Sequence, residues 1–336
     1  MSTHISTDIS KEFRWGILAS GGIAQAFARD LSYFNHHIVA AVGSRSQESA
    51  DSFAAEFPGC TAYSSYEALV ADPTLDAIYV ASPHPYHVSN TVLALNAGKP
   101  VLCEKPFTIN AAEARQMKAA ADANGVALME AMWARFLPHM HKVREILASG
   151  ILGDIWAVEA DHGQRLSDYA NPRHWEPSLG GGALLDLGIY PISFAHMVLG
   201  VPDKITSSAT FTDKGVDASS TVIFDYKSGA QAILTSNMMV STPCRATICG
   251  TLGKIEIDRT FYNPTSIRVI MHDGTTTEYP KEYKGHGLRD QALEFERVVR
   301  SGAKSSAILT PDESILIMES LDEVRKQIGL IYPSER

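Results

Sequence analysis

Short apolar runs alternate with helical segments through the first part of the chain, up to about residue 135. The strand candidates are FRWGIL, HHIVAAVGSR, DAIYVASP, VLCEK and VALMEA, which begin at residues 13, 36, 76, 101 and 126. The segments between them carry helix signals, such as Ile23, Phe27 and Leu31 at four-residue spacing. Strands that alternate with helices form βαβ units, which build a parallel sheet. We therefore predict an α/β fold with a Rossmann-type, doubly wound parallel sheet over residues 13–135.

The second half of the sequence has a different texture. After two helical stretches come KITSSATFTD, SSTVIFDYK, AQAILTSNM, CRATICGT, GKIEIDR, SIRVIMHDG and TTTEYP, separated by turn signals such as KSG, GTLG and HDG. Such runs predict a second α/β domain over residues 136–336, with a large, mostly antiparallel open sheet that leaves one face free for a partner. Two helices close the chain, and we expect that they can pack back on the first domain.

The size and charge of the chain restrict its partners. The chain has 336 residues. A single hydrophobic core is rarely this large, so the length favours two domains. It carries 29 Lys and Arg against 38 Asp and Glu, a net charge of −9. This balance disfavours nucleic acid and anionic membranes, because both bind basic surfaces.

The cysteines and the chain's start favour a cytoplasmic protein without a metal. The four cysteines form no CxxC pair, and no Cys/His cluster has zinc spacing. We therefore expect reduced thiols. The opening MSTHISTDISKEF lacks an apolar leader segment, and no apolar run approaches the ~20 residues that span a membrane.

The first strand leads into a Gly-rich turn, Ala19-Ser20-Gly21-Gly22-Ile23-Ala24. It matches the dinucleotide fingerprint GxGxxG or GxGxxA, but with alanine at the first position. Alanine serves there if its φ is negative, and Gly21 lets the backbone approach a pyrophosphate. We assign all six residues to cofactor binding. The alternative is an ordinary strand–helix turn, which the position after the first strand of a βαβ series disfavours.

The end of the second strand indicates which nicotinamide cofactor binds. An NAD site usually places Asp or Glu there to bind the ribose 2′-hydroxyl. This chain has Gly43-Ser44-Arg45-Ser46 instead, so no carboxylate would repel a 2′-phosphate. Arg45 can stack on the adenine or pair with the phosphate, and we assign Ser44 and Arg45 to NADP binding, with NAD less favoured. The alternative is a solvated Arg45 with an acid from elsewhere.

Five motifs occur in a fixed order along the chain: RWGILASGGIA, SPHPYH, GKPVLCEKP, LMEAMWARFLP and GGGALLDLGIYP. Together they resemble the Gfo/Idh/MocA oxidoreductase family over nearly the whole length. LCEKP, LMEAMWARF, GGALLDLGIY and the C-terminal EVRKQIGLIYP are similar in particular to its NADP-dependent dimeric dihydrodiol dehydrogenases and D-xylose dehydrogenases. The resemblance implies a Rossmann domain and a second domain whose sheet forms a dimer interface. It also implies a substrate between the nicotinamide and the second domain. We expect a homodimer or higher homo-oligomer.

Glu104 and Lys105 end the apolar strand VLC and are followed at once by Pro106. The carboxyl ends of parallel strands are where ligands of open α/β sheets bind. Burial beside a cofactor lowers a lysine pKa toward the range useful in acid–base catalysis. The family uses this lysine at the reacting oxygen, so the resemblance implies that Lys105 transfers a proton and also contacts cofactor and substrate. Glu104 would anchor or tune it in the cofactor site. The alternative is a structural Glu104–Lys105 ion pair.

Asp186 and Tyr190 lie four residues apart in GGGALLDLGIY, a spacing that places them on one helical face. Inositol-dehydrogenase-like family members carry His where this chain has Tyr190, and the dihydrodiol dehydrogenases carry Tyr. We predict that Tyr190 binds the substrate oxygen and shares proton transfer with Lys105, the proximal acid being left open. Asp186 would hold a substrate hydroxyl or orient Lys105. The alternatives are a surface carboxylate and a half-buried aromatic side chain.

SPHPYH follows a buried strand, where the resemblance implies a turn beneath the cofactor. We assign Ser82 and Pro83 to that turn. His84 stands where many family members have Asn, and we place it in the cofactor lining. His87 is assigned there too, although a packing role is as well supported by the sequence.

Further candidates follow the next strand and fill a long loop. Trp133 would wall the nicotinamide or the substrate, with core packing as the alternative, and Arg135 would approach the cofactor or a domain-interface carboxylate. The irregular loop GQRLSDYANPRHWEPSLGGG is expected to cap the substrate pocket, because irregular loops often carry function. Its candidate substrate residues are Arg165, Arg173, His174 and Trp175.

These observations predict an NADP-dependent oxidoreductase that acts on the CH–OH group of a sugar, polyol or trans-dihydrodiol. One alternative is a keto-sugar reductase with the same fold. Another is a non-catalytic NADP-sensing regulator, which would be expected to lack Lys105, Asp186 and Tyr190; all three are present.

Overall fold

The computed structural model describes residues 11–168 and 171–336, which form two compact units. The first comprises residues 11–107, 112–133 and 286–314, and the second comprises residues 108–111, 134–285 (without 169–170) and 315–336. Most of the polar N-terminal stretch that favoured the absence of a leader, residues 1–10, lies outside the described residues, as do two residues of the predicted capping loop.

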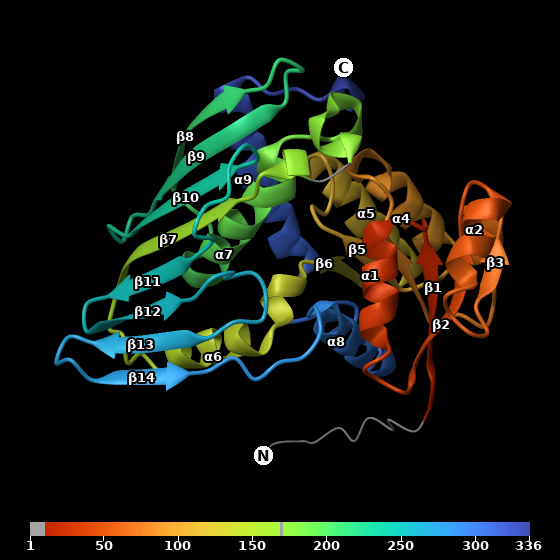
Figure 1. Ribbon diagram of the computed structural model, residues 1–336, viewed down its shortest axis with the longest axis horizontal. Coiled ribbons are helices and arrows are strands. Elements are labelled where there is room, and N and C mark those ends of the chain that lie inside the picture. The colour runs from red at the N-terminus through yellow and green to blue at the C-terminus, as the bar shows by residue number, and fades with distance from the viewer. Residues whose placement is uncertain (1–10, 169–170) are drawn as a thin grey trace. The chain divides into compact units, whose positions relative to one another are not determined.

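The first unit contains a six-stranded parallel sheet in the order β3-β2-β1-β4-β5-β6 (Figure 1). Its strands are β1 Phe13–Leu18, β2 His37–Gly43, β3 Thr61–Tyr63, β4 Ala77–Val80, β5 Val101–Glu104 and β6 Leu128–Ala131. Its helices are α1 Gly22–Leu31, α2 Gln47–Ala54, α3 Tyr66–Val70, α4 His87–Asn96, α5 Ala111–Asn124 and α8 Leu288–Arg300. The strand order reverses between β1 and β4, the topological switch point at which such sheets bind ligands. The predicted Rossmann-type sheet is confirmed.

The inner strands of this unit are buried on both faces, as expected for a parallel sheet covered by helices, whereas the edge strand β3 is partly exposed. Every residue of β4, β5 and β6 is buried. The ring of Phe27 on α1 stacks on Tyr79 of β4 with centroids 3.8 Å apart. Leu31 is also buried, but Ile23 is 37% exposed, so the predicted apolar stripe of α1 begins one turn late.

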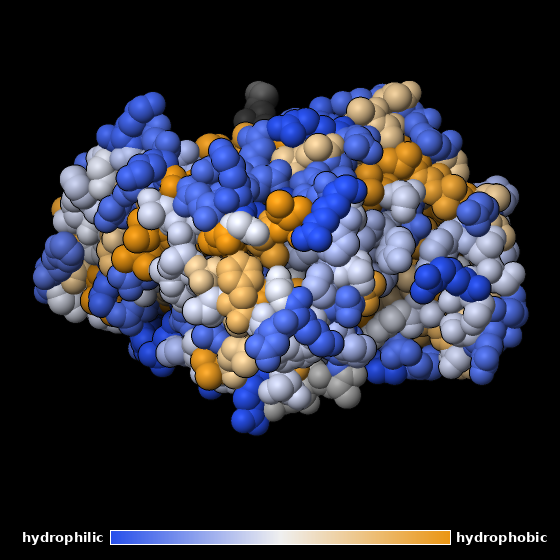
Figure 2. Space-filling view, turned by 90° about the horizontal axis from the view of Figure 1, so that it is seen from above, coloured by the Kyte–Doolittle hydropathy of each residue, from blue (hydrophilic) through white to orange (hydrophobic). Residues whose placement is uncertain are grey.

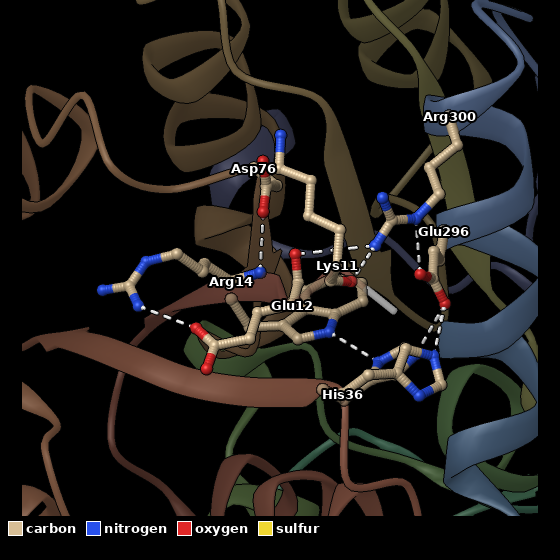
Figure 3. Close-up of polar contacts among 9 residues, drawn as sticks. Lys11, Glu12, Arg14, His36, Asp76, Glu296 and Arg300 are labelled. Carbon is tan, nitrogen blue, oxygen red and sulfur yellow. Dashed lines mark hydrogen bonds and ion pairs between the residues drawn. The ribbon is translucent and has the colours of Figure 1, made fainter. Parts of the chain in front are cut away.

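Helix α8 is tied to the β1–β2 side of the first unit by buried charges (Figure 3). Glu296 Oε2 contacts His36 Nε2 at 3.0 Å and His37 Nε2 at 2.8 Å, and Arg300 Nε donates to Glu296 Oε1 at 2.6 Å. Arg300 also donates to the backbone carbonyl of Lys11. Hydrogen bonds to a buried carboxylate are among the stronger ones, so this cluster fixes α8 against the sheet.

The second unit contains an eight-stranded sheet in the order β14-β13-β12-β11-β7-β10-β9-β8. Its strands are β7 Ile155–Gly163, β8 Lys204–Phe211, β9 Asp217–Asp225, β10 Gln231–Asn237, β11 Ala246–Gly250, β12 Gly253–Ile257, β13 Ile267–Met271 and β14 Thr276–Tyr279. Its helices are α6 Pro138–Ala148, α7 Ile189–Leu199 and α9 Pro311–Ile328, whose first turn is grouped with the first unit. Neighbouring strands are antiparallel except β7 and β10. The predicted mostly antiparallel sheet is confirmed.

One segment differs from the expected regular helix. Residues Leu184–Gly188 form a π-helical turn that continues into α7. The wider turn lies where Gly188 approaches β10, since a Cβ on Gly188 would lie 3.2 Å from Ser236 Oγ. Such turns are frequent at functional sites. The stretch Pro177–Leu199 is long and apolar enough to cross a membrane. However, 83% of its most apolar part is buried inside the protein, as in a core helix.

Candidate active site

The candidate site residues fall into two groups, one in each unit. In the first unit, the Gly-rich turn joins β1 to α1, and the Ala19 N–H donates to the Gly43 carbonyl at 3.0 Å, tying the turn to the end of β2. Gly21 precedes α1 with φ −74°. A Cβ added to Gly21 or Gly22 would meet no heavy atom within 4 Å. Neither glycine is required by packing inside the protein, and the backbone there is open to a close neighbour.

Ala19 adopts a left-handed conformation with φ 81°. The expectation that alanine serves at the first fingerprint position through a negative φ is therefore wrong. The turn keeps the shape that a glycine would give, and Ala19 adopts it at a cost of roughly 1–2 kcal/mol. The other residues of the turn differ in exposure: Ser20 is half-buried, Ile23 is exposed and Ala24 is fully buried.

The end of β2 presents a positive charge and a helix start. The Ser44 N–H donates to the Tyr63 carbonyl at 3.0 Å, so Ser44 extends the pairing with β3, and Arg45 is exposed beyond it. Ser46 caps α2 by accepting from the Ser49 N–H at 3.2 Å. Burial raises the pKa of Tyr66, and the positive charge of Arg45 partly opposes that rise.

At the end of β5, Glu104 anchors the backbone that carries Lys105. The buried Glu104 carboxylate accepts a hydrogen bond from the Tyr79 hydroxyl through Oε1 and from the Lys105 N–H through Oε2 at 3.1 Å. Lys105 is half-buried, and its peptide bond to Pro106 is cis. The side chain of Glu104 therefore holds the strand end that presents Lys105 at the edge of the sheet.

His87 connects the end of β4 with the Lys105–Pro106 segment. Its Nδ1 lies 2.9 Å from the Pro106 carbonyl oxygen, and its Nε2 lies 2.8 Å from the Ser82 carbonyl oxygen. His87 is fully buried, which gives it the packing role that the sequence left open. The ring of His84 lies 5.6 Å from that of His87. Ser82 Oγ is buried and has no hydrogen-bond partner among the described residues.

Trp133 begins the 3-10 turn Trp133–Phe136 that follows β6. Its ring centroid lies 5.1 Å from that of His286, just before α8. Trp133 is 4% exposed, as the core-packing alternative requires, and its ring packs at this corner of the first unit.

In the second unit, Asp186 holds together two residues of the predicted capping loop. Its Oδ1 accepts from Arg173 Nη2 at 3.1 Å, and its Oδ2 lies 3.4 Å from His174 Nε2. Asp186 belongs to the π-helical turn, and its side chain is only 12% exposed. Three candidate substrate residues thus meet in one cluster, in which a carboxylate fixes a guanidinium and an imidazole.

Tyr190 lies in an aromatic cluster that sequence reasoning missed. Its ring is 5.1 Å from His162 and 4.9 Å from Tyr262, and these two rings stack at 3.9 Å. Gln164 Nε2 lies 2.7 Å from the Tyr262 hydroxyl and 2.9 Å from His162 Nε2. His162 Nδ1 faces the Leu187 carbonyl at 3.1 Å, so in a neutral ring Nδ1 carries the proton and Nε2 accepts from Gln164. Burial raises the pKa of Tyr262.

The remaining candidates are spread over the second unit. Arg135 is buried, and its Nε donates to Ser193 Oγ of α7 at 3.0 Å, which places it in the core of this unit. Arg165 is exposed after β7. Trp175 is half-buried and packs on a cluster that contains Leu166 and Met238.

A histidine–carboxylate cluster in the first unit has the residue types of a metal site, but one of its nitrogen atoms carries a proton. Ligand atoms of His36, His37 and Glu296 lie within 4.8 Å of one another. The Trp15 indole N–H, which can only donate, points at His37 Nδ1 at 3.0 Å. His37 Nε2 therefore carries the proton that it donates to Glu296. A protonated nitrogen is not a metal ligand, so this cluster is a structural anchor for α8.

Comparison with known proteins places both units in one family. Residues 13–132 match the oxidoreductase family with an NAD-binding Rossmann fold, and residues 140–256 match the GFO/IDH/MocA C-terminal domain. The chain is 38% identical over 335 residues to trans-1,2-dihydrobenzene-1,2-diol dehydrogenase of Mus musculus, with 96% of this chain and 99% of that protein covered. It is 36% identical to the D-xylose 1-dehydrogenase (NADP⁺) of Hypocrea jecorina, with 95% and 93% covered.

Solved structures agree with this assignment. A 3-ketoreductase from Actinomadura kijaniata, solved with NADP and TDP-benzene, superposes with a TM-score of 0.83 at 26% identity, covering 95% of this chain and 98% of that chain. An aldose–aldose oxidoreductase from Caulobacter crescentus, complexed with glycerol, shares the fold with a TM-score of 0.85 at 23% identity over 95% and 98% of the two chains. The protein belongs to the Gfo/Idh/MocA oxidoreductase family.

Proposed function

We propose that the protein is an NADP-dependent oxidoreductase that transfers a hydride between the nicotinamide and a secondary alcohol or ketone of a sugar, polyol or trans-dihydrodiol. The observation that carries this proposal is the presentation of Lys105 at the carboxyl end of β5, where Glu104 fixes its backbone. Relatives that span almost the whole chain at 36–38% identity include dihydrodiol and NADP⁺-dependent xylose dehydrogenases.

Two features of the first unit fit the cofactor. The turn at Gly21 and Gly22 has room in front of α1, where backbone N–H groups suit a pyrophosphate. The buried Ser82 hydroxyl, with no partner among the described residues, suits a polar group of a ligand. In the proposal, the pyrophosphate is held by the turn 19–24. The proposed cofactor lining further comprises Ser82, Pro83, His84, Glu104, Lys105 and Trp133, whereas the buried positions of His87 and Arg135 favour packing roles for these two residues.

The choice of NADP over NAD rests on the end of β2. Arg45 is exposed beside the N-terminus of α2, and residues 43–46 contain no acid. A guanidinium and a helix start both favour a phosphate, whereas a carboxylate would favour the free 2′-hydroxyl of NAD. Ser44 and Arg45 are therefore the proposed 2′-phosphate residues.

The proposed chemistry divides the work between cofactor and protein. The bound nicotinamide accepts or supplies the hydride. The hydroxyl proton released during oxidation passes to a protein group, and the same group returns it during reduction. We assign that proton transfer to Lys105 and Tyr190. Asp186, fixed by Arg173 and His174, would hold a neighbouring substrate hydroxyl, with Arg165, Trp133 and Trp175 as further substrate contacts.

A substrate panel tests this proposal. Aldoses, inositols, anhydrosugars and trans-dihydrodiols are offered with NADP⁺ and separately with NAD⁺, and nicotinamide absorbance is followed. We expect turnover of at least one class, with NADP⁺ preferred. A clear NAD⁺ preference would overturn the cofactor assignment. Cofactor binding without turnover of any compound in either direction would favour the NADP-sensing regulator.

A keto-sugar reductase is the second candidate. It is favoured by the structural similarity to the 3-ketoreductase solved with NADP and TDP-benzene. Structures of that enzyme include variants in which a lysine is replaced by alanine or glutamate and one in which a tyrosine is replaced by phenylalanine. Keto-sugars offered with NADPH distinguish the two candidates by the direction in which kcat/KM is larger.

We further propose that the protein is a cytoplasmic homodimer or higher homo-oligomer that pairs through the outer face of its eight-stranded sheet. Outward positions of this sheet carry Ile223 and Ile233, the latter 44% exposed, among Thr and charged residues, whereas the inward positions are buried. Apolar side chains on the visible surface form separate patches among polar ones (Figure 2). All four cysteines are free thiols, which suits a reducing compartment. A monomer by light scattering would contradict the pairing.

A further inference from the structure

A fully buried carboxylate meets the start of the helical segment that carries Asp186 and Tyr190. Asp217 is the first residue of β9 and has no exposed surface. Its Oδ2 accepts a hydrogen bond from the Leu184 N–H at 2.7 Å. Leu184 begins the π-helical turn, and the first N–H groups of a helix have no partner within it. Asp217 therefore caps this segment from a distant strand, in the way that an N-cap Asn or Asp does from the position directly before a helix.

The approach of Asp217 explains one glycine of the GGG motif. A Cβ on Gly182 would lie 2.1 Å from Asp217 Oδ1, far inside contact distance. Gly182 also has φ +113°, a conformation that other residues rarely adopt. The Asp217 carboxylate therefore occupies the space that a side chain at position 182 would need.

The same glycines hold the loop that pairs with Asp186. A Cβ on Gly181 would lie 2.8 Å from the Arg173 carbonyl oxygen and 2.7 Å from that of His174. The Gly182 N–H donates to the His174 carbonyl at 2.9 Å. The helix start that Asp217 caps is therefore the point at which the backbone of Arg173 and His174 is attached.

A third contact comes from the C-terminal part of the chain. The buried Tyr332 hydroxyl donates to the Gly181 carbonyl at 3.0 Å, and the Arg325 guanidinium lies 5.4 Å from the Tyr332 ring. Burial raises the pKa of Tyr332 strongly, and the neighbouring Asp217 carboxylate adds to that rise.

We propose that Asp217 is a positioning residue for the reaction, which sets the start of the segment bearing Asp186 and Tyr190 and the attachment of the Arg173–His174 loop. This inference rests on the proposed function of those residues. A carboxylate without exposed surface is costly unless it is hydrogen-bonded. Here Oδ2 accepts from the Leu184 amide, which an apolar side chain would leave unpaired, while Oδ1 has no hydrogen-bond partner among the described residues.

The capping role is sensitive to protonation near neutral pH. Burial raises the pKa of Asp217 to about 7, and the N–H groups of Leu184, Asp217 and Ala183 oppose that rise. The titratable group that faces it from another element is Tyr332, beyond which lie Arg325, Glu335 and Asp186. Because the pKa is raised, the ionised form is less favourable in this buried place than in water, so the segment is held less firmly as pH rises through about 7.

Asp217→Asn tests the inference, with Asp225→Asn at the other end of β9 as the matched control. Asparagine keeps the size of the side chain but loses the charge, so the variant can fold. The first readout is amide hydrogen exchange of the peptide over residues 182–190 in the full-length protein. We expect this peptide to exchange faster than in the wild-type protein in Asp217→Asn and at the wild-type rate in Asp225→Asn. Unchanged exchange would overturn the cap.

The second readout is activity on the substrate found with the panel. Asp217→Asn should lower kcat at least tenfold, leave the NADPH dissociation constant unchanged, and remove an inflection near pH 7 from the kcat profile of the wild-type protein. Faster exchange with wild-type kcat and pH profile would overturn the positioning role. An inactive wild-type protein would instead refute the proposed function and with it the role in catalysis, whereas hydrogen exchange would still decide whether Asp217 is the cap.

Discussion

Glu104 accepts the backbone N–H of Lys105 at 3.1 Å, so the carboxylate of one residue fixes the main chain of the next at the end of β5. The other oxygen of Glu104 receives the Tyr79 hydroxyl from the neighbouring strand β4. A charge at the end of a buried strand is thereby satisfied by two donors. Lys105 follows directly, at the edge where parallel sheets bind ligands.

Glu104→Gln should destabilise the first unit. A glutamine offers one acceptor oxygen without charge in place of two charged ones, so we expect the free energy of unfolding to fall by about 1–3 kcal/mol. Denaturant unfolding measures this loss. Tyr79→Phe, which removes one donor only, should cost less. Equal stability of Glu104→Gln and the wild-type protein would show that these hydrogen bonds do not hold the strand end.

Tyr190→Phe removes the hydroxyl proposed for proton transfer and keeps the ring that packs on His162 and Tyr262. General acid–base groups typically contribute 10²–10⁴-fold, so we expect kcat to fall by roughly that factor. The affinity for NADPH, measured by fluorescence, should not change. The control Tyr226→Phe alters a hydroxyl that donates to the Gly200 carbonyl in the same unit and that we do not assign to the reaction. Near-normal turnover of Tyr190→Phe would remove it from the mechanism.

Arg45→Ala should weaken NADPH selectively. Hydrogen bonds to charged groups contribute about 1.5–3 kcal/mol, or roughly 10- to 100-fold, so KM for NADPH should rise by that range while KM for NADH stays constant. Steady-state kinetics with both cofactors measure the ratio. Arg29→Ala, an exposed cation on α1 paired with Glu56, is the control. A parallel rise for NADH would mean that Arg45 contacts the shared part of the cofactor.

Glu296 should make stability fall in acid. Burial raises its pKa, but hydrogen bonds from His37, Arg300 and His36 outweigh this and lower it to about 2 from 4.5. A depressed pKa means that the stabilisation is complete above pH 4.5 and is lost as pH falls toward 2. The free energy of unfolding of Glu296→Gln should therefore be lower than that of the wild-type protein by on the order of 3 kcal/mol at neutral pH. Near pH 2 the two free energies should be similar.

The control for this prediction is Glu145→Gln on the surface of α6. The Glu145 side chain is 64% exposed and pairs with Lys142, and such pairs contribute little to stability. Chemical denaturation as a function of pH measures both variants. A stability difference between Glu296→Gln and wild type that does not change with pH would contradict the assignment of the carboxylate as the charged centre of this cluster.

The two sheets were predictable because their periodicities differ. β4, β5 and β6 are buried on both faces and read as continuous apolar runs, while β9 and β10 alternate buried and exposed residues along the strand. These patterns are local in sequence, and so is the Gly-rich turn. Even there, the positive φ of Ala19 was not predictable, because backbone strain depends on how β1 pairs with the end of β2.

The environment of the proposed catalytic residues depends on distant parts of the chain. Tyr262 and His162 reach Tyr190 from a loop and a strand that lie far apart in sequence. Asp217 reaches Leu184 across 33 residues. A motif such as GGGALLDLGIY reveals that something approaches its glycines closely, but the identity of that neighbour follows from sheet register and helix packing alone.

Hydride transfer by the wild-type protein and by Lys105→Met tests whether Lys105 transfers the proton. NADPH formation is followed with the best substrate of the panel, and the NADPH dissociation constant is measured for both proteins. We expect Lys105→Met to lose roughly 10²–10⁴-fold in kcat while the dissociation constant stays unchanged. Turnover by Lys105→Met at a rate near that of the wild-type protein would contradict this role.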